Sequence, residues 1–311
     1  MTWVADDWSG SIITGSLGTE KLKFFTNLVD IQDLKNYNQF SSKEYFTFKP
    51  KMSHKLNYDK LKNISEVDAT FVSDLADLES RAGAFSDSMD SNLNVIHPGE
   101  GSSQLVLVSP AKLREFEIAF ADCLSYLGDL SSSWIERVKV LCAELVPIDS
   151  GDNHRPLRSD GAGLSTHFYR KGIFLSLPQI PGRVKVELLL NLVHELGHQA
   201  LFTYQRHDKI AYDCHRTPVF SAIRRTKRPL IQSIHAMIAI VYMLELIISA
   251  PEKFLGLGDK NYNKERFRGL IDDLKKAVEA LDRVEFTKLG KLIYREAVAI
   301  CLKSEMVYAK L

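Results

Sequence analysis

The chain of 311 residues is long enough to bury a full hydrophobic core, as one large domain or as two of ordinary size. Its 40 basic and 39 acidic residues almost cancel, so global charge gives no reason to expect nucleic acid or an anionic membrane as a partner. The four cysteines form no CxxC pair, which argues against a zinc ribbon or a redox pair and favours a reducing compartment. The N-terminus has neither the basic nor the apolar block of a signal peptide, and we therefore expect a cytoplasmic protein.

The first half of the chain predicts helices and short strands. The first hundred residues have a helical or irregular pattern, with polar turns around Asn36–Asn38 and an amphipathic segment from Val67 to Phe85. Gln104–Val108 has the pattern of a strand and Ala111–Leu127 that of a helix. Ile135–Val146 fits either a strand or a short helix.

The second half opens with a short apolar strand, Lys171–Pro178. Because proline is tolerated at a sheet edge rather than in its middle, we expect an edge strand that could hold an extended peptide. Pro181 and Gly182 then interrupt the chain, and Arg183–Tyr204 carries apolar residues at helical spacing.

The last third predicts three helices. Leu230–Ala250 is very apolar, but polar residues such as His235 and Glu245 interrupt it, and its unbroken part is too short to cross about 30 Å of hydrocarbon. A buried core helix explains it better than a membrane span. Asn263–Asp282 and Phe286–Lys310 are charged amphipathic segments that predict a helical hairpin.

The most informative feature is the HExxH sequence His194–His198 inside the predicted helix. Two histidines four residues apart project from one helix face, about 6 Å apart, so both imidazoles can bind one metal ion with Glu195 beside it. Only nine histidines occur in the chain, which makes a chance match to this pattern improbable. The sequence therefore predicts a metal site.

A catalytic metal generally needs a third protein ligand and an open position. The metzincin extension is excluded, because Leu201 and Tyr204 stand where its glycine and third histidine belong. A gluzincin-like glutamate on a following helix could be Glu245. His207 and His215 lie in a polar stretch, which is more typical of surface histidines.

His235 and a basic loop are further candidates. An imidazole at the start of the most apolar helix needs either a hydrogen-bond partner or a metal, and the sequence leaves both open. The basic loop Arg224–Arg228 fits a solvated loop, phosphate contacts, or a guanidinium that reaches the metal pocket and grips a carboxylate in a bidentate manner.

These segments, taken in order, resemble the HExxH-motif peptide-modification proteins of ribosomal peptide (RiPP) gene clusters. The likeness joins Gly172–Ser176, the HExxH motif, Ser221–Leu230 with its Arg224 and Arg228-Pro229, and His235, and it covers roughly Ser165 to Leu246. Ile223 stands where the family usually has tryptophan.

The resemblance implies an iron(II)- and 2-oxoglutarate-dependent oxygenase, on a fold distinct from the double-stranded β-helix, that hydroxylates the β-carbon of a residue in a precursor peptide. It implies His194, His198 and His235 as metal-site residues. Arg228, or else Arg224, would clamp the carboxylate of 2-oxoglutarate, and enzymes of the same biosynthetic cluster would be partners. Glu195 would be a ligand or an orienting group, whereas in a zinc peptidase it would be the general base that activates water.

We therefore expect a mostly helical α+β protein with the metal site on a central helix next to a small sheet. Neither an internal repeat nor a low-complexity linker divides the chain, so residues 1–311 predict a single domain. Its parts would be a variable N-terminal region (about 1–100), a metal-site core (about 101–250) and a C-terminal helical hairpin (about 259–311). An iron oxygenase, a zinc metallopeptidase such as a leader-peptide protease, and a non-catalytic, metal-stabilised peptide-binding protein are the three functions left open.

Overall fold

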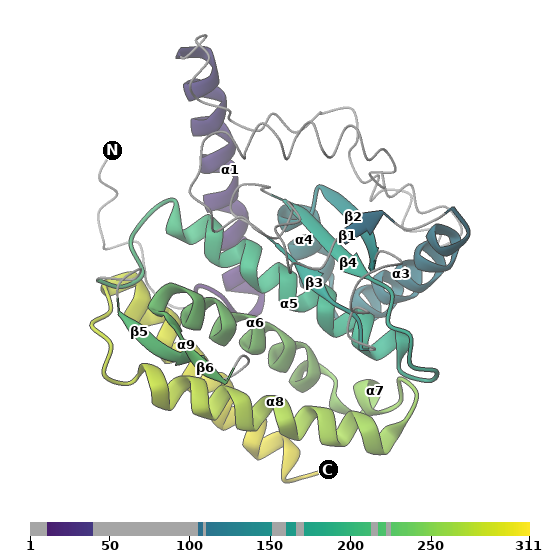
Figure 1. Cartoon of the computed structure of the whole chain (residues 1–311). Helices are drawn as coiled ribbons and strands as arrows, with labels where there is room; N and C mark the ends of the chain where they lie inside the picture. Colours follow the sequence, from purple (N-terminus) through teal and green to yellow (C-terminus); the bar gives the residue numbers. More distant parts are fainter. Residues whose placement is uncertain are drawn as a thin grey trace. The chain divides into compact units, whose positions relative to one another are not determined.

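The computed structural model in Figure 1 describes most of the chain outside the region between the first helix and the first strand. The described residues are 11–39, 105–107, 110–150, 160–165, 171–212, 217–221 and 225–311. They form a mostly helical α+β structure with one small mixed sheet and one two-stranded hairpin. The predicted amphipathic segment from Val67 to Phe85 lies outside the described residues.

The chain divides into two compact units, and one of the boundaries between them falls inside helix α5, Val184–Gln205. The first unit, here called the helical unit, includes the described residues up to Asp30, Leu130–Leu141 and Val193–Leu311. The second, the sheet unit, includes the described residues from Ile31 to Asp129 and Cys142–Leu192. The expectation of a single domain stays a prediction.

The sheet unit contains four short strands in the order β1-β2-β4-β3. Their bounds are Leu105–Leu107 (β1), Glu144–Ser150 (β2), Gly163–Leu164 (β3) and Gly172–Ser176 (β4). Strands β2 and β4 pair in parallel, and the two outer pairings are antiparallel. All five residues of β4 are buried, as expected for a strand with neighbours on both sides.

The position of β4 corrects the sequence-based expectation of an edge strand. Leu175 pairs with Pro147 of β2 on one side and with Gly163 of β3 on the other. The edge-strand prediction is therefore wrong, because Pro178 lies beyond the strand and does not interrupt its ladder. An extended peptide cannot add to β4 where β3 already occupies that edge.

Helix α3, Pro110–Leu130, belongs to the sheet unit except for its last residue, as does the first half of α5. The Lys185 ammonium of α5 lies 2.8 Å from the Asp122 carboxylate of α3, and Cys123 Sγ approaches the Lys185 carbonyl at 3.8 Å. Burial, with the nearby Asp122 charge, raises the pKa of the Cys123 thiol to about 12, so this cysteine behaves as an apolar core residue.

The helical unit is built around α6, Leu230–Ser249, which packs on both of the last two long helices (Figure 1). The other elements of this unit are α4 (Ser132–Leu141), α7 (Pro251–Leu255), α8 (Lys260–Leu281), α9 (Lys288–Tyr308), β5 (Pro218–Ser221) and β6 (Thr226–Pro229). Helices α8 and α9 pack on each other, which confirms the predicted helical hairpin. Each begins at a capping side chain, Asp259 and Thr287 respectively.

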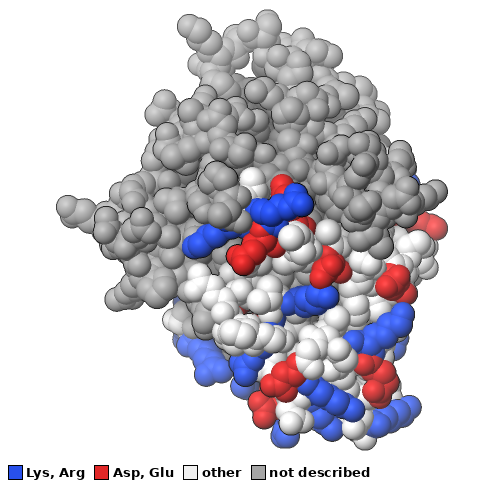
Figure 2. Space-filling view, turned by 90° about the vertical axis from the view of Figure 1, so that its right-hand side faces the viewer, with Lys and Arg blue, Asp and Glu red and all other residues white. Residues whose placement is uncertain are grey.

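Helix α6 is apolar and long enough to be a candidate membrane span among the described residues. However, 78% of the relevant window is buried inside the protein, as in the core helix of a soluble protein. Lysine, arginine and acidic residues are interspersed on the described part of the face that Figure 2 displays. That mixture agrees with the near-zero net charge.

Helix α1 spans Gly15–Gln39, and the short segment before it makes polar contacts with α9 and α5. The backbone N–H groups of Ile13 and Thr14 each donate to Glu296 of α9 at 3.1 Å. The Tyr204 hydroxyl, near the end of α5, donates to the Ile12 carbonyl. The segment before α1 is thereby tied to α9 through Glu296 and to the last turn of α5 through Tyr204.

Two other predicted segments differ from the structure. Asn36–Asn38 are not turns but lie in the last turn of α1, since the helix continues to Gln39. The ambiguous stretch Ile135–Val146 contains both alternatives, the end of α4 and the beginning of β2, with a break after Leu141. Neither the helical nor the strand periodicity of apolar residues could therefore describe the whole stretch.

Candidate metal centre

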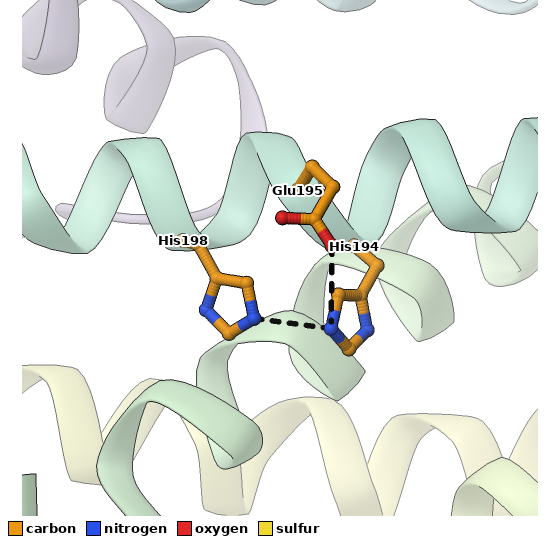
Figure 3. Close-up of side chains that lie close together, drawn as sticks. All are labelled: His194, Glu195 and His198. Atoms are coloured by element: carbon orange, nitrogen blue, oxygen red, sulfur yellow. Dashed lines mark hydrogen bonds and ion pairs between the residues drawn. The ribbon is translucent and has the colours of Figure 1, made fainter. Parts of the chain in front are cut away.

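The HExxH motif lies in the middle of α5, as predicted. His194 Nε2 and His198 Nε2 face each other at 3.0 Å, with the rings nearly perpendicular, because residues four apart share one helix face (Figure 3). Bonds of about 2.0–2.1 Å to one ion would separate two imidazole nitrogens by roughly 3.0–3.4 Å. The observed distance therefore fits two histidines that share a metal ion.

Glu195 supplies a carboxylate beside this pair. Its side chain is 2% exposed, and its Oε1 lies 3.8 Å from His194 Nε2. One ligand atom from each of His194, Glu195 and His198 can be chosen so that all three lie within 4.8 Å of one another. The side chain of His194 is 24% exposed, so solvent reaches the group from the His194 side.

Gly197, inside the motif, explains how α6 comes close to these histidines. A Cβ atom at Gly197 would lie 3.1 Å from Ala239 Cα and 3.2 Å from the Ile238 carbonyl oxygen. Only glycine lets the two helix backbones approach this closely without displacement. The predicted packing of the apolar helix on the metal helix is thereby confirmed, and His235, one turn before Ala239, is brought beside His198.

His235 contacts His198 on the side of the ring that faces away from His194. The two Nδ1 atoms are 3.2 Å apart, and His235 Nε2 lies 3.0 Å from Gln205 Oε1 at the end of α5. The Phe202 ring packs on the His235 ring, with 4.5 Å between the ring centroids. His198 thus has one ring nitrogen directed at His194 and the other at His235.

The start of α6 is fixed by the β5-β6 hairpin. The Leu230 N–H donates to the Thr217 carbonyl at 2.8 Å, and the buried Ser233 hydroxyl donates to the Val219 carbonyl at 3.2 Å. The first bond satisfies a backbone N–H that the first turn of a helix leaves without an intrahelical acceptor, and the two bonds together set the direction of α6. They therefore help to position His235, two residues beyond Ser233.

The predicted basic loop is partly a strand. Arg225 has a left-handed backbone, with φ of 54°, in the turn of the hairpin, and Arg228 is half-buried on β6, paired with Val219. Arg228 therefore precedes His235 of α6 by less than two helical turns in sequence. Arg224 lies outside the described residues.

Glu245 is not near the histidines but belongs to a separate buried cluster. Arg137 of α4 holds its carboxylate in a bidentate ion pair at 2.7 and 2.8 Å, and the Gly15 N–H donates to it at 2.6 Å. Desolvation alone would lower the pKa of Arg137, but the Glu245 carboxylate, together with Tyr242 and Tyr204, raises that pKa above its ordinary value. The interpretation of Glu245 as a gluzincin-like ligand is wrong, because its oxygens already serve Arg137.

Of the remaining histidine candidates, His207 has a structural role away from the site. His207 Nε2 lies 2.9 Å from the Phe25 carbonyl, and its ring packs on the Phe25 ring, so it holds α1 against the end of α5. His215 lies outside the described residues.

Gln205 is the contact that sequence reasoning missed. It follows His198 by seven residues, and Phe202 follows by four, so the three share one stripe of α5 with His194. That spacing was visible in the sequence. A glutamine at the end of a helix nevertheless does not indicate a functional site by itself. Gln205 acquires a role only because α6 brings His235 within hydrogen-bonding distance.

Comparison of the chain with models of known protein families finds no match, and no curated protein matches it significantly. The site must therefore be interpreted from its own geometry.

Proposed function

We propose that the protein is a metal-dependent, peptide-modifying enzyme, and that its metal ion binds between His194 and His198 in the middle of helix α5. The observation that carries this proposal is the 3.0 Å separation of the two Nε2 atoms, with the buried Glu195 carboxylate beside them. Two facing imidazole nitrogens can share only one proton, whereas one metal ion satisfies both lone pairs.

Iron(II) with 2-oxoglutarate is the cofactor pair that we propose. Two histidines and one carboxylate form the donor set of many non-haem iron oxygenases, and His194, Glu195 and His198 provide it. The resemblance to the RiPP-cluster proteins points the same way. When bound, iron and 2-oxoglutarate would supply the oxidation that places a hydroxyl on the β-carbon of a peptide residue.

The roles of the chain's own residues follow from this assignment. Glu195 completes the ligand set or orients a ligand. Arg228, and after it Arg224, holds the remote carboxylate of 2-oxoglutarate, because a guanidinium matches a carboxylate in two hydrogen bonds. Substrate enters from the His194 side, where the site is exposed.

The proposed substrate is a precursor peptide, modified in the cytoplasm together with enzymes of the same biosynthetic cluster. Neither nucleic acid nor a membrane is proposed as a partner. The mixed surface charge and the burial of α6 both support that choice.

A zinc metallopeptidase is the second candidate, and one distance favours it. Glu195 Oε1 lies 3.8 Å from His194 Nε2, which exceeds the roughly 3 Å between neighbouring ligands at bond lengths near 2.1 Å. A carboxylate set back in this way can hold a metal-bound water and act as a general base. Cleavage of a peptide, rather than oxygen insertion, would then be the activity.

Metal content is the first test. The protein is purified without oxygen and analysed for bound metals, together with His194→Ala, His198→Ala and the control His207→Gln. Glutamine at 207 can still donate to the Phe25 carbonyl, so the control should retain one equivalent of metal, and both alanine variants should lose it. Full metal content in both alanine variants would end the metal-site proposal.

Activity separates the candidate functions. The iron(II)-loaded protein is incubated in air with a library of synthetic peptides, with and without 2-oxoglutarate, and succinate and peptide masses are measured. Succinate formation with the gain of one oxygen supports the oxygenase. Peptide cleavage by the zinc-loaded protein, independent of 2-oxoglutarate, supports the peptidase, and neither product would leave a non-catalytic peptide-binding protein.

A further inference from the structure

His198 uses its two ring nitrogens in opposite directions, and this limits what His235 can do. Its Nε2 faces His194 Nε2 at 3.0 Å, whereas its Nδ1 faces His235 Nδ1 at 3.2 Å. The two nitrogens of an imidazole point away from each other across the ring. An ion held by His194 and His198 therefore lies on the far side of the His198 ring from His235.

The hydrogen bonds also have a direction. Gln205 Oε1 is an acceptor, so the proton between it and His235, 3.0 Å apart, belongs to His235 Nε2. A neutral His235 then presents Nδ1 as an acceptor, and the 3.2 Å contact requires a proton on His198 Nδ1. This leaves the lone pair of His198 on Nε2, the nitrogen that faces His194.

We propose that His235 and Gln205 are positioning residues that fix the tautomer and the ring orientation of His198, and that His235 is not itself a metal ligand. The proposal rests on the metal centre proposed above and adds the reason why His198 is ready to bind the ion. A hydrogen bond of this kind to the distant nitrogen of a ligand histidine strengthens metal binding, typically 10- to 100-fold.

This assignment changes the chemistry of the site. With His235 engaged by Gln205, the protein offers His194, His198 and the Glu195 carboxylate, rather than three histidines. Positions around the ion on the exposed His194 side then stay open for a bidentate ligand. The helix packing at Gly197 becomes part of the metal site, because it sets the distance between His235 and His198.

Two substitutions at 235 separate a positioning role from a ligand role. In His235→Asn the amide oxygen lies close to where Nδ1 was and can still accept from His198, whereas His235→Leu removes the acceptor and keeps an apolar core side chain. We expect the leucine variant to bind zinc or cobalt(II) 10- to 100-fold more weakly and the asparagine variant to stay within a few-fold of the parent. Equal loss in both variants would show that His235 is a ligand and would overturn the proposal.

Spectroscopy gives a readout that a purely structural role would not move. In the zinc-loaded protein, the His198 Nδ1 proton should give a slowly exchanging, downfield NMR resonance. It should persist in His235→Asn and vanish in His235→Leu, while the cobalt(II) absorption spectrum keeps the same band shape in parent and asparagine variant because the ligand set is unchanged. A changed cobalt spectrum in His235→Asn would contradict the proposal.

Substitutions of Gln205 test the far end of this chain of hydrogen bonds. Gln205→Leu removes the acceptor and should weaken zinc binding about 10-fold, whereas Gln205→Glu retains an acceptor and should bind at least as tightly as the parent. Gln232→Leu, an exposed glutamine on α6, is the matched control and should have no effect. Unchanged affinity in Gln205→Leu and His235→Leu, with metal still lost in His198→Ala, would refute this inference alone. Retention of metal in His198→Ala would instead refute the proposed function.

Discussion

Helix α6 carries His235 in its first half and Glu245 in its second half, and the two side chains are held in different ways. The Glu245 carboxylate receives two hydrogen bonds from Arg137 and one from the Gly15 N–H, so its partners are all supplied by the protein. His235 instead lies within a chain of hydrogen bonds that runs from Gln205 through His235 and His198 to His194.

This difference separates a structural polar cluster from a candidate active site. Around Glu245, charge is matched by charge: Arg137 also donates to Thr19 and lies over the Trp134 ring at 4.4 Å. Between His194 and His198, two Nε2 atoms face each other at 3.0 Å, and either a shared proton or a metal ion can join them. A buried ionisable residue is therefore informative only once its partners are known.

The largest effect should come from breaking the Glu245 cluster. Arg137→Ala leaves a carboxylate that is 12% exposed without its cation, and we expect a loss of about 3 to 5 kcal/mol in the free energy of unfolding. Urea denaturation measures this, with Arg114→Ala, an 80% exposed arginine on α3, as a control that should change stability by less than about 0.5 kcal/mol.

Metal affinity of the folded Arg137→Ala protein should equal that of the parent, because its cluster is separate from the histidines. A large loss of metal affinity with intact stability would show that the two clusters are not independent. The comparison between them would then fail.

The second prediction concerns Arg228 and ligand binding. If Arg228 clamps the carboxylate of 2-oxoglutarate, Arg228→Leu should weaken 2-oxoglutarate binding by about 2 to 4 kcal/mol while metal content stays intact. Lys227→Leu is the matched control: it is exposed on the same strand, and adjacent strand residues point to opposite faces. Anaerobic titration of the iron(II)-loaded variants measures both affinities.

Equal 2-oxoglutarate affinity in Arg228→Leu and the parent would remove Arg228 as the clamp and leave Arg224 to be tested in the same way. Absence of 2-oxoglutarate binding by the parent would favour the peptidase.

The helices and the centre of the metal site could be predicted from the sequence, because both depend on local spacing. Apolar periodicity identified α5, α6, α8 and α9, and the spacing of four residues placed His194 and His198 on one face. The partners of His235 and Glu245 could not be predicted, since they depend on which helices pack together. From the sequence, a carboxylate in an apolar helix can bind a metal ion or pair with an arginine. Glu245 pairs with Arg137 because α4 and the start of α1 pack beside it.

The edge-strand error has a similar origin. Proline after an apolar strand predicts a sheet edge, but Pro178 follows β4 by two residues and leaves its ladder intact. Strand order depends on distant segments, such as the two residues of β3, that carry no signal in sequence.

The third prediction tests the approach of α6 to the histidines. Gly197→Ala places a Cβ 3.1 Å from Ala239 Cα, so the helices must separate by a few tenths of an ångström, at a cost of about 1 to 3 kcal/mol in stability. Because His235 moves with α6, zinc affinity should also fall. Gly269→Ala on α8 is the control, since its Cβ meets nothing within 4 Å and alanine should stabilise that helix by roughly 0.5 to 1 kcal/mol.

Thermal unfolding and zinc titration of both glycine variants measure these effects. Normal stability and normal zinc affinity in Gly197→Ala would show that the close approach does not position His235.

The smallest effect is expected at Glu136, the neighbour of Arg137 in sequence, and it tests whether burial makes the Glu245 cluster strong. Glu136 pairs with Lys139 at 3.1 Å and with Lys23 at 3.4 Å, but its side chain is 37% exposed. The hydrogen bond from Lys139 is the main cause that lowers the pKa of Glu136 in the folded protein. The pair therefore adds stability above the unfolded pKa of about 4.3, and this stability is lost as the pH falls through the lower folded value.

Glu136→Gln should consequently cost less than about 1 kcal/mol at neutral pH, because solvent and salt screen exposed pairs. Urea denaturation at pH 7 and at pH 3 or below, at low and high salt, measures the difference from the parent. That difference should shrink with added salt and disappear at acid pH, where the carboxyl group is protonated in both states. If Glu136→Gln lowered the free energy of unfolding as much as Arg137→Ala, burial would not be what makes the Arg137–Glu245 pair strong.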